Sequence, residues 1–404
     1  MSAREGLNPG GGTLLFSINA LVITALILTL NLSLRTMLQW DETRWDELVE
    51  LHSEDLPFRI RPFTNVAVTA LVDTFSLSNR DAFVITQYSL IFAFLLSFTA
   101  LLSKMEFRAR ERLLGMWALG FSFPILCIHF IPNFTWDDLW AYLGLIWMTY
   151  FLLDKRLYPA ALCLIFASLS RENVLITAVA FYFFRNPRES WRSWVLPAAL
   201  GCGVYVLYRF VVFPDFLPGR LSRLPVNFSD INAAKQSIHS LFVSFGWIWT
   251  AAGIMTWRTI RDYKANIFSL NWRLSMSALV IGFLTIGLTL IAGLSRETRL
   301  FFTPFVFLIP LGIASLSDKR FMENVRSVYD SMRLRYLIAI ALTIFAICLV
   351  GTILVFPIYS YLPMKDFHRL VFAGNIALSI MIIATQSAKC RNLFAKSSVL
   401  RKLA

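Results

Sequence analysis

Long apolar stretches alternate with short polar segments along the whole chain. The apolar stretches cover residues 13–36, 82–102, 114–131, 138–153, 157–170, 173–184, 194–213, 241–257, 274–294, 300–316, 336–357 and 369–386. Most of them reach the length of about 17–25 residues that a helix needs to cross the hydrocarbon layer of a membrane. The pattern predicts an all-α polytopic membrane protein with about 10–12 transmembrane helices.

The two shortest neighbouring stretches, 157–170 and 173–184, are interrupted by the charged pair Arg171-Glu172. They form either two short tilted helices or one broken span. No small-residue cleavage site follows the first stretch, so we expect residues 13–36 to be a membrane anchor and not a removed signal peptide.

The composition excludes several other classes of protein. Hydrophobic residues make up 57% of the 404 residues and charged residues only 16%, with a mean hydropathy of +0.62. Soluble domains carry about 25% charged residues. An ordinary soluble enzyme, a disordered tail and a fibrous protein are therefore excluded.

The basic residues indicate the topology. The chain has 38 Lys and Arg against 25 Asp and Glu, a net charge of +13. The Lys and Arg residues gather in short clusters between apolar stretches, as at 104–112 and 319–335, and cytoplasmic loops of membrane proteins are enriched in these residues. We therefore expect no nucleic-acid binding, and we place both the N- and the C-terminus in the cytoplasm.

Three segments on the opposite side are long or charged. Segment 37–81 is the first and longest extracytoplasmic loop, segment 214–240 is the second, and 295–299 holds three charges. No cytoplasmic loop is long enough to fold as a domain. We expect a single transmembrane domain over residues 1–404 with no soluble domain, and chemistry built from its outer loops.

A narrow polar stripe runs through residues 63–77 of the first outer loop. Asn65, Thr69, Asp73 and Ser76 recur every three or four residues on an otherwise apolar segment. This spacing suits a helix that lies in the membrane interface. A re-entrant or ordinary loop helix would give a similar pattern.

Acidic residues cluster at two places on the outer side. Asp41, Glu42 and Asp46 directly follow the first apolar stretch, and Asp137 and Asp138 precede the fourth. One carboxylate of the first group, half-buried at the membrane surface, would have a raised pKa and suit a general base. The second group is either a further acidic group of the site, including a metal ligand set, or a helix N-cap. A solvated acidic loop is the simpler explanation for the first group.

Two similar strings carry the arginines of interest. Ser170-Arg171-Glu172 and Ser295-Arg296-Glu297-Thr298-Arg299 both fall at expected outer ends of apolar stretches. Charges beside apolar segments are costly unless they are paired or reach water. Arg is the preferred planar clamp for phosphate, so Arg171, Arg296 and Arg299 are candidate phosphate-binding residues. The alternative is a structural Arg–Glu pair inside each string, which we favour for the two Glu residues.

Other chemistry has no sequence support. The four His residues are isolated, no residues have metal-ligand spacing, and there is no Walker A motif, no GxGxxG and no Ser-His-Asp order. Four of the five Cys residues lie inside apolar stretches and none forms a CxxC pair, so they are interpreted as small core residues. Primary ATP-driven transport by this chain alone is excluded.

The string Asp41-Glu42-Thr43-Arg44-Trp45 resembles the GT-C superfamily of membrane glycosyltransferases. Its motif is most similar to that of the aminoarabinose-to-lipid-A transferases and protein O-mannosyltransferases. The resemblance continues with an interfacial helix near 63–77, an acidic residue at Asp137 or Asp138, the Arg171-Glu172 string, and Arg299 followed by a Pro-spaced apolar run. The chain departs from the pattern where the late motif of the family has Arg-Tyr and this sequence has Arg299-Leu300.

The resemblance implies a reaction and its partners. A sugar would pass from a polyprenyl-phosphate donor to a hydroxyl acceptor on a lipid, a glycan or a protein, with inversion. Asp41 would be the general base, Glu42 would orient it, and Arg171, Arg296 and Arg299 would hold the donor phosphate. Some members use a divalent metal, Mg²⁺ or Mn²⁺, as a cofactor. The expected location is the bacterial inner membrane, with membrane lipid as a further partner.

Two other functions compete with sugar transfer. A secondary transporter or lipid flippase would place ionisable residues near the membrane midplane on broken helices. An inactive scaffold protein of an envelope polysaccharide pathway would need no site at all. Whether the first acidic loop and the arginines converge on the outer side is the discriminating observation.

Overall fold

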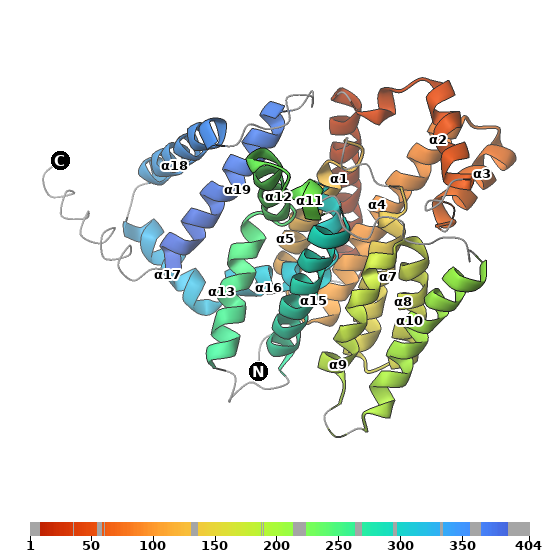
Figure 1. Cartoon of the computed structure of the whole chain (residues 1–404). Helices are drawn as coiled ribbons and strands as arrows, with labels where there is room; N and C mark the ends of the chain where they lie inside the picture. The colour runs from red at the N-terminus through yellow and green to blue at the C-terminus, as the bar shows by residue number, and fades with distance from the viewer. Residues whose placement is uncertain are drawn as a thin grey trace, which may run out of the picture.

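The computed structural model describes most of the chain. It covers residues 9–34, 36–54, 59, 61–130, 136–186, 188, 190–212, 224–262, 269–293, 297–331, 334–355 and 365–386. Every regular element within these residues is a helix (Figure 1). The predicted all-α polytopic class is confirmed, because several of the helices are long and apolar enough to cross a membrane.

Among the described residues, six helices meet the length and composition of a membrane span. They are α1 (Pro9–Ser33), α4 (Asn79–Lys104), α10 (Arg192–Val212), α15 (Leu270–Ala292), α18 (Leu334–Val355) and α19 (Lys365–Gln386). Two further helices, α12 (Ile231–Val243) and α13 (Trp247–Arg261), meet at an angle of 68° and would form a seventh span if counted together. The bend occurs at Gly246, whose φ of 53° is readily adopted by glycine alone.

The remaining expected spans are shorter helices. They include α5 (Ala109–Gly120), α6 (Phe123–Leu126), α7 (Asp138–Leu153), α8 (Leu157–Ser170), the 3₁₀ helix η3 (Glu172–Val179), α9 (Ala180–Phe184), the 3₁₀ helix η4 (Thr298–Phe301) and α16 (Phe305–Ser317). The expected stretches 157–170 and 173–184 are two elements, because the chain takes an extended conformation at Arg171 before η3 begins. The total of about ten to twelve spans stays a prediction.

The short helices α7 and α16 lie in the middle of the bundle (Figure 1). Most positions of both helices are buried on all sides, as expected for helices that are apolar all round. Helix α7 packs closely against α8 because Gly144 has no side chain: a Cβ there would lie 2.9 Å from that of Ala167. These central helices carry no lipid-facing stripe, so their ends are positioned by the surrounding spans.

The described residues of segment 37–81, which we expect to be the first outer loop, are largely helical. They contain the 3₁₀ helix η1 (Met37–Gln39), α2 (Glu42–Glu54) and α3 (Phe63–Phe75). The helix expected over 63–77 is therefore present and ends at Phe75, where Ser76 takes the left-handed conformation with φ of 54°. Its position in a membrane interface stays a prediction.

The two ends of the bundle differ in character. Helices α2 and α3 lie at one end, and α9 and the first turns of α10 and α15 lie at the other (Figure 1). At this second end Lys104 pairs with Asp154, and Lys155 donates a hydrogen bond to the carbonyl of Phe184. The basic turns after α4, α7 and α9 therefore meet at one end, as the charge pattern requires of loops on one side of a membrane.

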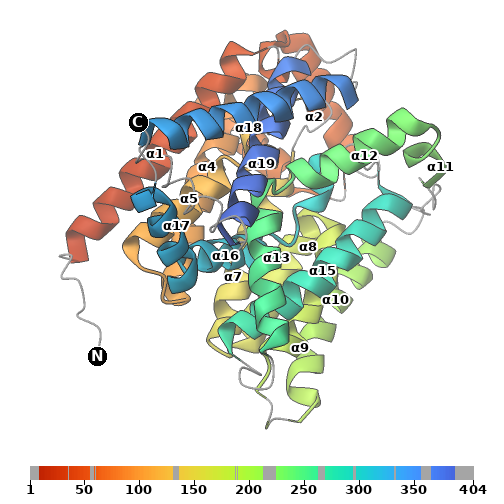
Figure 2. The same cartoon turned by 90° about the vertical axis from the view of Figure 1, so that its left-hand side faces the viewer.

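The C-terminal helices form a separate side of the bundle. Helices α18 and α19 pack on each other, and α17 (Lys319–Ser331) packs against α19. They face the viewer in Figure 2, away from α8 and α10. The other short element of the described chain, α11 (Leu224–Asn227), falls in the expected second outer loop and contacts α12 and α15.

Candidate functional site

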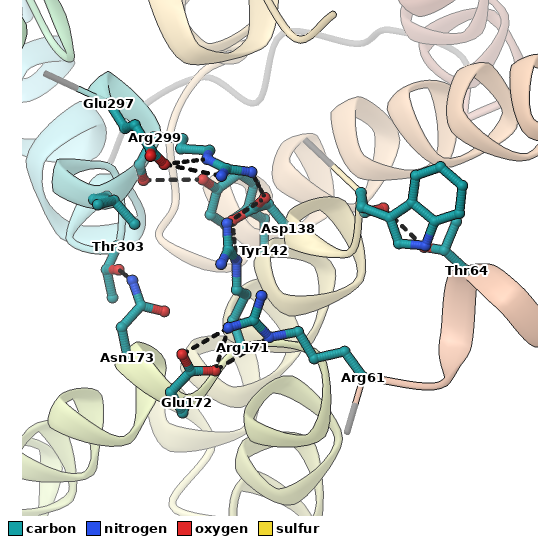
Figure 3. A network of polar contacts seen from close by, with 12 residues as sticks. Arg61, Thr64, Asp138, Tyr142, Arg171, Glu172, Asn173, Glu297, Arg299 and Thr303 are labelled. Atoms are coloured by element: carbon teal, nitrogen blue, oxygen red, sulfur yellow. Dashed lines mark hydrogen bonds and ion pairs between the residues drawn. The ribbon is translucent and has the colours of Figure 1, made fainter. Parts of the chain in front are cut away.

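Two arginines from distant parts of the chain converge on one carboxylate at the first turn of α7 (Figure 3). Arg171 follows the last residue of α8 and binds Asp138 through two nitrogens, with Nε 2.5 Å from Oδ1 and Nη2 2.9 Å from Oδ2. Arg299 lies in η4 and places Nη1 3.3 Å from the same Oδ2. Asp138 is 2% exposed and Arg171 is 7% exposed, so this contact is shielded from water.

Arg299 is fixed from two further directions. Its Nε and Nη2 lie 3.1 Å and 2.9 Å from Oε2 of Glu297, two residues earlier in the chain. The hydroxyl of Tyr142, one turn after Asp138 on α7, donates a hydrogen bond to the carbonyl of Arg299 at 3.3 Å. The side chain of Arg299 therefore has a defined place beside α7 (Figure 3).

A third arginine comes from the segment just before α3. Arg61 precedes α3 and binds Glu172 of η3 with three contacts between 2.7 Å and 3.2 Å. The side chain of Arg61 is 10% exposed and that of Glu172 is 46% exposed. Next to it, Asn173 donates a hydrogen bond to the hydroxyl of Thr303 at 3.3 Å, which ties η3 to the start of α16.

These ion pairs form one group, which we call the arginine network: Arg61, Asp138, Arg171, Glu172, Glu297 and Arg299. The network has three positive and three negative side chains, which is the balance that burial of charge requires. A guanidinium has five N–H donors. The contacts of Arg171 with Asp138 use its Nε and Nη2, so its Nη1 is not engaged by Asp138 and can donate to a further oxygen ligand.

Asp137, the residue before Asp138, points to α3 and not to the arginines. Its Oδ1 accepts a hydrogen bond from the backbone N–H of Thr64 at 3.2 Å, and the side chain is 3% exposed. Burial raises the pKa of Asp137 to about 7, against the opposing effect of the Thr64 hydrogen bonds and of Arg61 and Arg171. A carboxyl group with such a pKa is close to half-protonated at neutral pH, the condition that suits a general base.

Helix α2 covers the neighbourhood of Asp137 with its C-terminal turn. His52 stacks on Trp136 with ring centroids 4.1 Å apart, and its Nδ1 lies 2.8 Å from the carbonyl of Leu48. The carbonyl of Trp136 accepts hydrogen bonds from Thr64 and Gln87 at 2.8 Å and 2.9 Å. Burial is the main cause that lowers the pKa of His52 to about 4, with a smaller contribution from nearby arginines and against the effect of the Leu48 hydrogen bond, so this imidazole is neutral at physiological pH.

The first acidic group lies elsewhere. Asp41 is exposed and its Oδ1 accepts a hydrogen bond from the N–H of Arg44 at 3.0 Å, an N-cap contact for α2. Eleven residues separate Asp41 from His52, which is about 16 Å of helix at 1.5 Å per residue. Glu42 is also exposed, and Asp46 accepts a hydrogen bond from Asn79 at 2.7 Å. The structure brings none of these three side chains into contact with the arginine network.

Among the other predicted residues, the structure brings Asp138, Arg171 and Arg299 together, whereas Arg296 lies outside the described residues. The Arg–Glu pair expected inside each string forms between Glu297 and Arg299. In the other string, Glu172 instead binds Arg61.

The sequence reasoning missed Arg61, Tyr142 and His52 as members of this region. Arg61 belongs to a basic string directly before the expected interfacial helix, and this position could have identified it as a candidate. Tyr142 is one aromatic among many in an apolar stretch, and His52 is one residue of an acidic helix. Neither pattern distinguishes them from residues without a role.

The described residues do not fit a divalent metal. No group of three or more His, Cys, Asp or Glu side chains is close enough there to hold an ion. The carboxylates of the arginine network are already bound to guanidinium groups.

Comparison with known proteins adds no relative. The chain matches no protein-family model, and searches of the curated proteins and of the solved structures likewise find no match. The functional conclusion therefore depends on the geometry of the arginine network and on the sequence motif.

Proposed function

We propose that this chain is a membrane glycosyltransferase that moves a sugar from a polyprenyl-phosphate donor to a hydroxyl acceptor on the outer side of the membrane. The observation that carries the proposal is the convergence of Arg171 and Arg299 on Asp138, beside the pair that Arg61 forms with Glu172. Such a place lets a lipid-anchored phosphate react at the boundary with water while its chain stays in the bilayer. The GT-C-like motif at 41–45 supports the same class of reaction.

The donor phosphate is bound by Arg171 and Arg299. Both guanidinium groups are planar and permanently charged, and such groups bind phosphate oxygens in pairs. Asp138 holds the two arginines in place before the donor arrives, so less side-chain freedom is lost on binding. The leaving phosphate gains charge during the reaction, and the same arginines stabilise this charge.

A groove between α13 and α15 suits the hydrocarbon chain of the donor. It has a volume of about 440 Å³ and is lined mostly by apolar side chains, including Leu308 of α16. No atom lies within 4 Å of a Cβ built at Gly253 or Gly282, so these two glycines keep the groove open. Further along α15, outside the groove lining, the hydroxyl of Thr289 donates a hydrogen bond at 3.3 Å to the carbonyl of Leu300, the residue after Arg299.

We infer that Asp137 is the general base, with its carboxyl group on the α3 side of the arginine network. It adjoins Asp138 in the chain, and its raised pKa suits proton transfer at neutral pH. Asp137 takes the proton of the acceptor hydroxyl while the acceptor oxygen bonds to the anomeric carbon. The bond from that carbon to the phosphate oxygen breaks, and polyprenyl phosphate leaves with the electron pair. The resemblance gives the role of base to Asp41, with Glu42 as its support.

The test measures release of polyprenyl phosphate from a panel of polyprenyl-phosphate sugars by the full chain in liposomes, with lipid, glycan and peptide hydroxyl compounds supplied as acceptors. We expect Asp137→Asn to reduce release at least about 100-fold, the usual contribution of a general base. We expect Asp41→Asn to keep more than half of the wild-type rate. A large loss of release in Asp41→Asn with little loss in Asp137→Asn would identify Asp41 as the base. The absence of release from every donor would overturn the proposal.

A transporter or flippase is the second candidate, because the helices are interrupted where the charges lie. The chain changes from α8 to the 3₁₀ helix η3 at Arg171, and Arg299 lies in η4 just before α16. Interrupted helices of this kind bind ions and anionic substrates in transporters. Movement of an intact lipid-linked sugar across the liposome membrane, without release of polyprenyl phosphate, would support this function. An inactive scaffold would show neither activity, and the exposed position of Asp41 favours this alternative.

A further inference from the structure

A second hollow lies at the end of the bundle opposite to the arginine network. It has a volume of about 490 Å³ and lies between α1, α4, α5 and α7. Tyr150 of α7 lines this hollow, whereas Asp138 belongs to the network at the start of the same helix. Tyr150 is twelve positions after Asp138, which is about 18 Å of helix, so the α1–α4 hollow is a separate place in the molecule.

The α1–α4 hollow contains two cations. Arg112 of α5 donates from Nη1 to the hydroxyl of Ser103 at 3.1 Å, and its guanidinium lies 4.6 Å from the ring centre of Phe16. Its Nε is buried and has no hydrogen-bond partner among the described residues. Lys104, the last residue of α4, is paired with Asp154. The charges of Arg112, Lys104 and Asp154 leave a surplus of one positive charge.

The rest of the lining is part polar and part apolar. Hydroxyl groups come from Ser17 and Thr99, and apolar contacts come from Phe16, Leu96 and Ala100. Helix α1 exposes Leu14, Ile18 and Leu21 at neighbouring positions, where they would contact hydrocarbon chains. A ligand that suits this lining has an anionic, hydrogen-bonding head and an apolar body.

We propose that the α1–α4 hollow binds the headgroup of an anionic phospholipid, with its phosphate on Arg112 and Lys104. The unpartnered Nε of Arg112 supplies a donor for a phosphate oxygen, and burial of this donor strengthens the bond. Basic pockets between transmembrane helices on the positively charged side of a protein suit such headgroups. The apolar part of the lining favours a lipid over a free phosphate ion, which has no body to fill it.

The test is retention of lipid by the purified full chain in detergent. Phosphatidylglycerol and phosphatidylcholine are added in turn, and bound lipid is counted by native mass spectrometry while thermal unfolding is followed in parallel. We expect the wild type to prefer phosphatidylglycerol. We expect Arg112→Met to weaken its binding about tenfold, the usual effect of losing a hydrogen bond from a charged group.

The matched control is Arg110→Met, which removes an exposed arginine from the same helix and leaves binding unchanged. Equal retention of the two lipids by the wild type, or equal losses in the two variants, would overturn the proposal. Stabilisation by inorganic phosphate alone, equal to that by phosphatidylglycerol, would also overturn it and indicate a free anion. If Arg112→Met does not fold, Ala100→Leu narrows the hollow without changing its charge, and unchanged lipid retention in that variant counts against the site.

Discussion

Asp138 is the residue whose loss most directly tests the arginine network. Its side chain accepts hydrogen bonds from both Arg171 and Arg299 and is 2% exposed. Asp138→Asn keeps the shape but removes the charge, which leaves two guanidinium groups facing a neutral amide. Removing one partner of a buried ion pair costs about 3–5 kcal/mol of unfolding free energy. We expect a loss in this range.

A second pair in the same network gives the contrast. The side chain of Glu172 is 46% exposed and that of Arg61 is 10% exposed, so water reaches this pair from the carboxylate side. Exposed ion pairs contribute about 0–1 kcal/mol. We therefore expect Glu172→Gln to cost about 1 kcal/mol or less, several-fold less than Asp138→Asn.

The assay is equilibrium unfolding of each variant in the same detergent, followed by a double-mutant cycle of Asp138→Asn with Arg171→Met. Because the two side chains are in direct contact, we expect their effects to be non-additive by about 1–3 kcal/mol. A loss below about 0.5 kcal/mol in Asp138→Asn would refute the reasoning. Strictly additive effects would refute it as well, since they would mean that the pair adds nothing to folding.

Three further predictions follow from the same structure. The pKa of Asp137 is raised to about 7 and that of His52 is lowered from 6.5 to about 4 by burial, so their effects on stability oppose each other. In Asp137→Asn, the free energy of unfolding should increase as pH rises from about 4 to 6.5, because His52 is still protonated in the unfolded state and neutral in the folded state. In His52→Gln it should decrease as pH rises to about 7, because Asp137 is still protonated in the folded state and ionised in the unfolded state. Unfolding measured against pH checks both signs. Gly282→Leu should raise the KM for long-chain donors and leave the KM for water-soluble short-chain donors unchanged. Gly287→Leu on the same helix is the control, because both positions have open space for a side chain but, of the two, Gly282 alone lines the α13–α15 groove. Gly246→Ala should cost more than about 1 kcal/mol in unfolding assays, because φ of 53° is strained for alanine and the added Cβ would overlap an amide side chain of α19.

The hydrophobic pattern alone predicted the class of fold. Each of the twelve apolar stretches coincides with a helix or a pair of short helices in the described chain, since a segment without charges has no stable place except inside a bundle or a bilayer. The stripe at 63–77 predicted helix α3 for a similar reason. The breaks at Arg171 and near Arg299 were also visible, because charged residues interrupt the apolar stretches there.

The membership of the arginine network was only partly predictable. Arg171, Arg299 and Asp138 stood out as charges at the ends of apolar stretches, and the structure brings them together. The first acidic group stood out in the same way, yet Asp41 caps α2 and lies at its distant end. A motif of five residues says nothing about the direction in which the helix after it runs.

The sequence by itself determined where helices form and which residues stand at their ends, because these properties depend on local hydrophobicity and charge. The tertiary structure decided which ends meet. The pairing of Arg61 with Glu172, and not of Arg171 with Glu172, depends on the packing of α3 and η3 against α7 and α8. Ion-pair partners are selected by distances of a few ångströms in three dimensions, and spacing along the chain does not encode these distances.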